Sequence, residues 1–351
     1  MLLDLSCLSY PLPPDVRRLY EAGDFGRMEL VIRRRLDDPC VPEALKARLR
    51  VQMEMAYEIP RAYPYTRAQM LDILQKNVSG FAEEELETLR DDGTLDWRYV
   101  NGEVRFKNNA LSALLKTRKE YAMRATDPAV MSGTKASTEQ LSAMIAKMKA
   151  NGGVRARFEL HEELTVRSDR LTEGETLRIH LPMPIVGAQV KRAELLSASH
   201  PVAFHAPEDE PQRTIYFELP YEPGMTVSAE IAYEIDAPYA QPHAREVYAE
   251  QPVFDTEELP PHVVFTPYLR ALAKEIVGDE TNALLKARKI YDFITTQAVY
   301  RFMPPYLTVP NIPEYFLSGL RGDCGVQAIT FVTLCRLCGV PAQWQSGLYT
   351  K

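Results

Sequence analysis

The sequence lacks any long apolar run. No stretch of its 351 residues approaches the roughly 20 apolar residues that a helix needs to cross a membrane. The first residues lack the basic start of a secretory signal, because they carry an acid at Asp4 and reach a proline at Pro11. The formal net charge of -7 disfavours a general nucleic-acid binder. These absences predict a cytoplasmic protein whose partners include neither a membrane nor a nucleic acid.

Cysteine is scarce and unevenly spaced. An odd count without a signal argues against a disulfide framework. The five cysteines are Cys7, Cys40, Cys324, Cys335 and Cys338. We expect reduced thiols, each in the first instance a small buried hydrophobe. The pair Cys335-x-x-Cys338 has no second Cys/His pair and lies inside an apolar helix pattern, so packing is favoured over a zinc or redox site.

Other motifs for cofactors are also missing. No glycine-rich phosphate-binding loop and no internal repeat is visible. The segment from His161 to Thr165 starts like a zinc-protease motif, but Thr165 stands where the second histidine must be. The sequence therefore predicts a protein without a metal or an organic cofactor.

What is present is the composition of a globular protein, with 46% hydrophobic and 25% charged residues. The length suggests two or three domains and, with mixed helical and strand patterns, a multidomain α+β fold. Residues 1–125 show helical spacing, and Asn101-Gly102 between alternating β-formers predicts a hairpin. Helix, helix, hairpin is typical of a winged helix. Residues 126–150 predict a helical connector.

A winged helix invites a DNA-binding interpretation, which the charges oppose. The helix before the hairpin carries Glu83, Glu84, Glu85 and Glu87, and duplex phosphates would repel that face. We expect a packing or partner-binding module there instead.

The middle of the chain changes character. Residues 151–240 form short runs with period-two alternation separated by turn residues, which predicts an antiparallel β-sandwich. Residues 241–261 are rich in proline and predict a linker.

The most informative segment surrounds Gly322-Asp323-Cys324-Gly325, which precedes a strongly apolar helix closed by Gly339 and Pro341. A cysteine at a helix N-terminus meets unpaired N–H groups and a dipole that stabilise a thiolate. The flanking glycines would let a substrate backbone approach closely. Asp323 can cap the helix, although its charge works against thiolate formation. The residues after Pro341, AQWQSGLY, predict a strand.

The run RGDCGVQAITFVTLCRLCGVPAQWQSGLY resembles the core of the transglutaminase-like superfamily. The resemblance covers residues 262–351 and implies part of a papain-like α+β core. It implies a Cys-His-Asp triad with Cys324 as the nucleophile, with the N–H of Cys324 in the oxyanion hole. The implied reaction is acyl transfer, or hydrolysis of an amide or peptide, with a protein or peptide as the substrate and no cofactor.

The sequence departs from that family in one respect. The family's histidine and aspartate follow the cysteine, whereas all the histidines of this sequence precede it. They are His161, His180, His200, His205, His243 and His262. We expect the reading frame to continue past Lys351 and supply both residues, and the 351-residue chain itself to be inactive. The alternative is a non-catalytic interaction or scaffold protein with a degenerate transglutaminase-like core. The substrate, the choice between hydrolysis and cross-linking, and the oligomeric state do not follow from the sequence.

Overall fold

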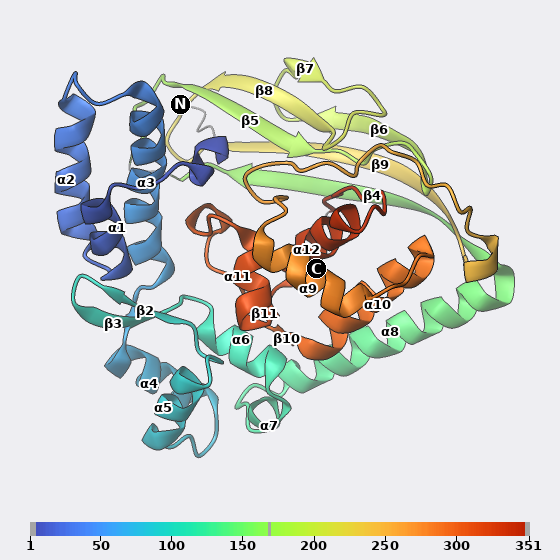
Figure 1. Cartoon of the computed structure of the whole chain (residues 1–351), viewed down its shortest axis with the longest axis horizontal. Helices are drawn as coiled ribbons and strands as arrows, with labels where there is room; N and C mark the ends of the chain where they lie inside the picture. The colour runs from blue at the N-terminus through green and yellow to red at the C-terminus, as the bar shows by residue number, and fades with distance from the viewer. Residues whose placement is uncertain (1–4, 168–169, 348–351) are drawn as a thin grey trace. The chain divides into compact units, whose positions relative to one another are not determined.

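The structure is a computed structural model that describes residues 5–167 and 170–347, with only the backbone described at residues 130–137. The chain, whose helices and strands are labelled in Figure 1, divides into two compact units. The first consists of Met1–Lys135 with His243–Trp344, and the second of Ala136–Pro242 with Gln345–Lys351. The N-terminal region and the region around Cys324 thus share one unit. The five segments predicted from the sequence differ from this division and stay predictions.

The first unit begins with a small bundle of helices. In chain order these are η1 (Leu5–Ser9), α1 (Pro14–Glu21), α2 (Phe25–Asp37) and α3 (Glu43–Ala62). Met28 and Ile32 of α2 are fully buried against Leu49 and Ile59 of α3. Asp24 caps α2 by accepting a hydrogen bond from the Arg27 amide at 3.1 Å. The apolar positions at helical spacing therefore form the predicted buried face.

A helical layer with a small sheet follows. Its helices are α4 (Arg67–Asn77), α5 (Glu83–Asp91), α6 (Ala110–Thr117) and α7 (Lys119–Ala122), and its strands are β1 (Tyr65–Thr66), β2 (Trp97–Val100) and β3 (Glu103–Phe106). Helix α8 (Ala129–Asn151) follows, and its residues from Ala136 onward belong to the second unit. The hairpin at Asn101-Gly102 is confirmed: both residues have positive φ, and β2 pairs antiparallel with β3. Strand β1 pairs with the other side of β3. The winged-helix name for this region stays a prediction.

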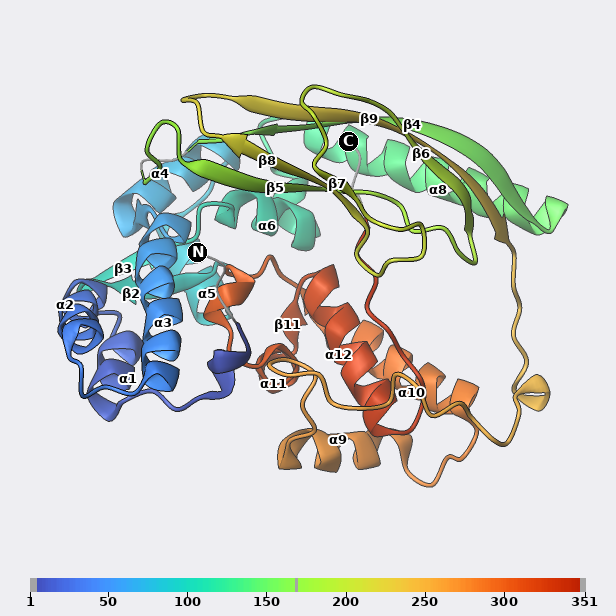
Figure 2. The same ribbon diagram turned by 90° about the horizontal axis from the view of Figure 1, so that it is seen from above.

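The second unit contains two three-stranded antiparallel sheets (Figure 2). Their strands are β4 (Gly153–Thr165), β5 (Thr176–Pro182), β6 (Val190–Ala198), β7 (Phe204–His205), β8 (Thr214–Pro220) and β9 (Thr226–Pro238). One sheet has the order β4-β9-β6 and the other β5-β8-β7. The predicted antiparallel strands are thus confirmed.

One hydrophobic cluster joins these two sheets. Phe217 of β8 and Ile179 of β5 belong to it, together with Val227 and Ile231 of β9. In β5, in β8 and in the first half of β9 the buried residues alternate with less buried neighbours, which explains the period-two pattern of the sequence there. The β-sandwich name for this arrangement stays a prediction.

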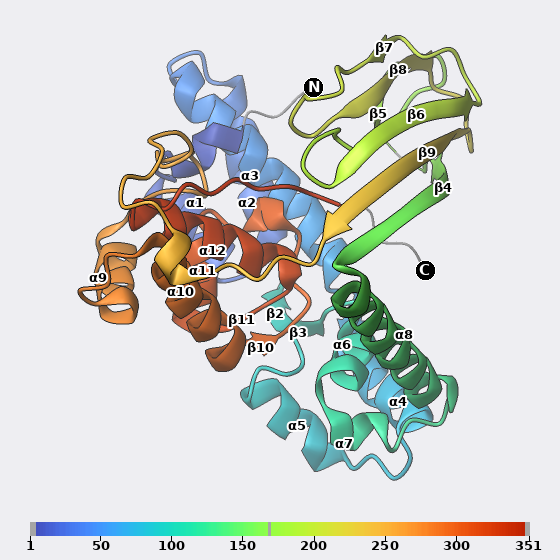
Figure 3. The same cartoon turned by 90° about the vertical axis from the view of Figure 1, so that its right-hand side faces the viewer.

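The first unit ends with the part that contains Cys324. Its elements are η2 (Ala244–Glu246), α9 (Pro267–Val277), α10 (Ala283–Gln297), β10 (Val299–Tyr300), η3 (Tyr306–Thr308), α11 (Ile312–Gly319), β11 (Arg321–Gly322) and α12 (Cys324–Leu337). Helix α12 packs against α9, α10 and α11 (Figure 3). Strands β10 and β11 form a two-stranded parallel sheet.

The predicted strand AQWQSGLY does not form where the structure describes it. Residues 342–347 are irregular, and residues 348–349 lie outside the described part. A strand needs a partner for its N–H and C=O groups. Among the described residues, the sheet of β10 and β11 has two strands, and residues 342–347 do not pair with either of them.

The cysteines are free thiols in two kinds of surroundings. Cys7 and Cys335 are buried as expected, and Cys338 is half-buried. Cys40 and Cys324 are exposed, so the expectation of a small buried hydrophobe is wrong for them. Between residues 5 and 347, no described helix is both long and apolar enough to cross a membrane.

Candidate active site

Cys324 is the first residue of α12 and its side chain is exposed. The chain enters this helix from β11, which pairs with β10 through Val299 and Arg321 and through Tyr300 and Gly322. The turn before β11 is tight, because Leu320 adopts a left-handed conformation and its amide bonds the Phe316 carbonyl. The sheet and the turn therefore fix where the helix starts and where the thiol emerges.

Asp323 is the cap of α12, as predicted. Its Oδ1 accepts hydrogen bonds from the Val326 amide at 3.1 Å and from the Tyr306 hydroxyl at 2.5 Å. Its Oδ2 accepts from the Met303 amide at 3.4 Å. Burial and the hydrogen bond to Asp323 raise the pKa of Tyr306, so this hydroxyl keeps its proton and remains a donor. The carboxylate is thus held by three donors and belongs to the support of the site.

The two glycines beside Asp323 and Cys324 have a packing role that the sequence did not reveal. A Cβ on Gly325 would overlap the Tyr306 hydroxyl. A Cβ on Gly322 would lie 2.8 Å from the Val326 side chain and 2.9 Å from that of Phe316. The expected reason, close approach of a substrate backbone, is therefore replaced at these positions by close approach of the protein's own side chains.

Two backbone amides at the start of α12 have no acceptor. The N–H groups of Cys324 and Gly325 make no hydrogen bond with any residue the structure describes. The next two amides are used, since Val326 donates to Asp323 Oδ1 and Gln327 donates to the Asp323 carbonyl. Free amides at a helix N-terminus, next to an exposed thiol, favour negative charge on a sulfur or an oxygen placed there.

The rest of α12 is a rigid support. Val326, Leu334 and Cys335 lie in a cluster with residues of α9, α10 and α11. Burial raises the pKa of the Cys335 thiol to about 12 and also raises that of Cys338. The structure thus agrees with packing for this pair, and among the described residues no group of three metal-binding side chains is found.

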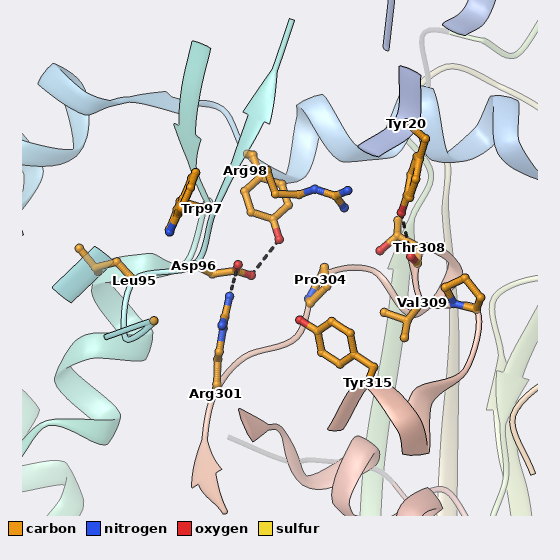
Figure 4. A pocket seen from close by; sticks show the side chains of 13 residues that line it. Tyr20, Leu95, Asp96, Trp97, Arg98, Arg301, Pro304, Thr308, Val309 and Tyr315 are labelled. Atoms are coloured by element: carbon orange, nitrogen blue, oxygen red, sulfur yellow. Dashed lines mark hydrogen bonds and ion pairs between the residues drawn. The ribbon is translucent and has the colours of Figure 1, made fainter. Parts of the chain in front are cut away.

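The loop 301–308, which precedes the cysteine in sequence, carries Tyr306 to Asp323. The N-terminal region of the same unit holds this loop at three points, and Figure 4 shows those at Arg301 and Thr308. Arg301 forms an ion pair with Asp96, and Asp96 also accepts a hydrogen bond from the Tyr63 hydroxyl at 2.8 Å. This first contact fixes the start of the loop.

The other two contacts fix the middle and the end of the loop. The Lys107 ammonium donates to the Met303 carbonyl, and the Tyr20 hydroxyl donates to the Thr308 carbonyl at 3.0 Å. Lys107 is 5% exposed, and burial lowers the pKa of its ammonium while Asp96 and Asp323 raise it. A buried cation is stable here because carbonyl and carboxylate oxygens surround it.

These holding residues were missed by sequence reasoning. Asp96 directly precedes β2 and Lys107 directly follows β3, so both flank the predicted hairpin. Tyr306 lies in a proline-rich loop that carries no periodic pattern. A hairpin signal predicts the turn but says nothing of which distant loop its ends will contact.

No histidine of this unit is placed at Cys324. His243 precedes the short helix η2, and His262 lies in the turn bridged by Leu259 and Val263. His262 is half-buried, its buried Nδ1 has no partner among the described residues, and burial lowers the pKa of its imidazole. The other four histidines belong to the second unit.

Comparison with known families addresses this region of the chain. The model of the Transglutaminase-like superfamily matches residues 270–351. This segment is transglutaminase-like. The match includes Cys324 and all of α10, α11 and α12, and it begins within α9. The predicted resemblance is confirmed for this part of the chain.

Two further comparisons complete the picture. A search of curated proteins finds no match. Among solved structures, the chain is similar to a "Putative Cysteine Protease" from Cytophaga hutchinsonii, with 17% identity and a TM-score of 0.39. That similarity covers 54% of this chain and 67% of the other. A score of this size carries no argument about function.

Proposed function

We propose that this protein performs cysteine-dependent acyl transfer or amide hydrolysis, with Cys324 as the nucleophile. The observation that carries the proposal is the exposed Cys324 thiol at the start of α12, beside two unpaired amides. The transglutaminase-like match of residues 270–351 supports it. The substrate class is a protein or peptide amide, as the resemblance implies.

The reaction assigns a role to each of these groups. The Cys324 sulfur, after passing its proton to a base, attacks the carbonyl carbon of an amide. The negative charge that forms on the carbonyl oxygen is stabilised by the amides of Cys324 and Gly325. The C–N bond then breaks, the amine leaves with the proton from the base, and a thioester remains on the sulfur. Water or a second amine attacks the thioester and restores the thiol.

The base is the missing part of this reaction. His243 and His262 lie elsewhere in the unit, and the family resemblance implies a histidine and an aspartate after the cysteine. We propose that such residues act on Cys324 in the active protein. Asp323 does not take the aspartate's role, because its oxygens already accept from Val326, Tyr306 and Met303.

Thiol alkylation tests the nucleophile with an internal control. Cys324 and Cys40 are both exposed free thiols, but Cys40 does not begin a helix. Iodoacetamide labelling of the intact chain, read by peptide mass mapping from pH 5.5 to 8.5, should modify Cys324 at least about tenfold faster than Cys40 near pH 6.5. Equal rates for the two thiols across this range would contradict an activated Cys324.

Turnover tests the complete reaction. Ammonia release from a glutamine-containing dipeptide, with and without an added primary amine, should be absent for the 351-residue chain. In any form of the protein that releases ammonia, the release should be lost on Cys324→Ala. Release by the 351-residue chain that persists in Cys324→Ala would refute Cys324 as the nucleophile.

The second candidate function is a non-catalytic interaction protein. The observation that favours it is the location of His243 and His262 away from Cys324. It predicts slow, Cys40-like alkylation of Cys324 and no ammonia release. The alkylation ratio therefore separates the two candidates without requiring a known substrate.

The finer predictions about the chain remain part of this proposal. We propose a winged-helix-like region in 1–125, a connector in 126–150, a β-sandwich in 151–240, a linker in 241–261 and a partial papain-like core in 262–351. The shared cluster of the two sheets supports the sandwich, and the β2–β3 hairpin after α4 and α5 supports the winged helix. We further propose a cytoplasmic location, supported by the free thiols, and no membrane or nucleic-acid partner.

A further inference from the structure

A cavity of about 430 Å³ lies in the first unit between the start of β2 and the loop 301–310 (Figure 4). Its apolar walls come from Leu95 and Trp97 on one side and from Pro304 and Val309 on the other. Neither Cys324 nor Tyr306 lines it, so it is a different site from the proposed active site. Apolar walls with a few polar groups are typical of a small-molecule site.

Arg98 supplies an unpaired positive charge to this cavity. Its guanidinium lies 5.2 Å from the centre of the Tyr20 ring and 6.0 Å from that of Phe25. It makes no hydrogen bond or ion pair with any residue the structure describes. Aromatic rings attract a cation but carry no negative charge, so its donors remain without an acceptor. A half-buried guanidinium in this state favours an anion.

The other charges of the cavity cancel. Arg301 is paired with Asp96, whose carboxylate also accepts the Tyr63 hydroxyl. The lining residues include one carboxylate and two guanidinium groups, so the walls carry a net positive charge, which is that of Arg98. Arg105 lies opposite Arg98 on β3 and is bonded to Glu103 and to the Pro64 carbonyl. Arg105 carries the same charge as Arg98, so it repels Arg98 and cannot accept a hydrogen bond from it.

Tyr315 adds a hydrogen-bond donor. Its ring is 39% exposed, but the hydroxyl lies among the cavity residues, where burial raises its pKa and Arg301 and Arg98 partly oppose that rise. The hydroxyl has no partner among the described residues. Figure 4 shows Arg98 extending from β2 and Tyr315 rising from α11 toward Pro304. An unpaired cation and an unpaired hydroxyl thus line one cavity.

We propose that this cavity binds a carboxylate attached to a small apolar group, with Arg98 as the ionic partner and Tyr315 as a hydrogen-bond donor. A carboxylate carries the single charge that Arg98 leaves unmatched. A phosphate dianion would bring a second negative charge, and the described lining has no further unpaired guanidinium to receive it. The apolar body of the ligand would contact Leu95, Trp97 and Val309.

Binding is tested on the full chain with N-acetyl-L-leucine and, as the uncharged match, N-acetyl-L-leucinamide. A ligand of this size should bind with a dissociation constant of about 1–10 mM. The acid should bind at least about tenfold more tightly than the amide, by calorimetry. Trp97 lines the cavity and only Trp344 accompanies it, so a Trp344→Phe variant reports the same titration by fluorescence.

Variants localise the binding. Arg98→Gln should lose at least about tenfold in affinity for the acid and none for the amide. Arg270→Gln is the matched control, because Arg270 also lies over a ring, that of Phe265 at 5.5 Å, outside the cavity. Arg98→Lys should retain part of the affinity. Thermal unfolding shows whether each variant is folded, and the acid-to-amide comparison on the unmodified chain needs no variant.

A further part of the experiment asks whether the natural carboxylate is a polypeptide C-terminus or a free acid. An acetylated tetrapeptide ending in leucine should bind more tightly than N-acetyl-L-leucine if the natural ligand is a polypeptide C-terminus, and equally if it is a free acid. Both results support the carboxylate site. Equal binding of acid and amide, unchanged affinity in Arg98→Gln, or tighter binding of inorganic phosphate than of the acid would overturn the proposal.

Discussion

The two ends of α12 treat the same residue type in opposite ways. At the first turn, Cys324 is exposed and its own amide and that of Gly325 are unpaired. At the last turn, Cys335 is buried among apolar side chains and burial raises its pKa to about 12. The difference teaches that position on a buried helix, and not the residue type, decides which thiol is available for chemistry.

The last turn is also closed by polar contacts that the first turn lacks. Arg336, 8% exposed, donates to the carbonyls of Ala342 and Glu257 and pairs with Asp255. Lys286 donates to the Cys338 carbonyl at 3.0 Å. The carbonyls of Leu334, Cys335 and Arg336 at this end accept from the amides of the residues that follow the helix, while two amides at the other end have no acceptor among the described residues.

The largest expected effect concerns the two thiols. A pKa of about 12 leaves about a thousandth as much thiolate on Cys335 at pH 8 as its ordinary value of 9.0 would. Cys335 should therefore label with iodoacetamide about a thousandfold more slowly in the folded chain than in urea. Mass mapping measures both rates, and rapid labelling of Cys335 in the folded chain would contradict the burial of this thiol at the last turn of α12.

The next effect tests the polar contacts at the last turn of α12. Arg336→Ala should lower the free energy of unfolding by about 3 kcal/mol, because it leaves two carbonyls and the Asp255 carboxylate without their donor. Urea denaturation followed by circular dichroism measures the loss. Arg288→Ala on α10 is the control, since Arg288 is exposed and pairs only with Asp292; it should change stability by less than about 0.5 kcal/mol.

The smallest effect tests the packing of Gly325 at the first turn of α12. Gly325→Ala should lower the free energy of unfolding by about 2 kcal/mol, because its Cβ would overlap the Tyr306 hydroxyl. In a Tyr306→Phe background the same substitution should cost less, since that hydroxyl is gone. A double-mutant cycle by denaturation measures the coupling. Identical costs in both backgrounds would show that this contact does not require the glycine.

Local signals predicted a large part of this structure. Asp323 before an apolar helix, and Gly339 with Pro341 after it, predicted the bounds of α12, because caps act within one turn. Asn101-Gly102 predicted the hairpin for the same reason, since only a few residues accept the backbone angles of that turn.

Long-range contacts could not be predicted in this way. Lys107 reaches Met303 across a separation of 196 residues, and Tyr20 reaches Thr308 across 288. No periodicity or cap encodes such a pairing, because it depends on how separately formed elements pack. The strand predicted after Pro341 failed in residues 342–347 for a related reason: alternation favours a strand, but a neighbouring strand must complete it.

The contacts of Asp96 and Lys107 have a consequence for how such a chain is assembled over evolution. A recombination breakpoint between residues 125 and 262 would join a transglutaminase-like core to a foreign N-terminal segment. The Met303 carbonyl and the Arg301 guanidinium would then lose their partners, and the loop that brings Tyr306 to Asp323 would lose its anchors. A shuffled descendant would therefore need new anchors before its cysteine is held in the same place.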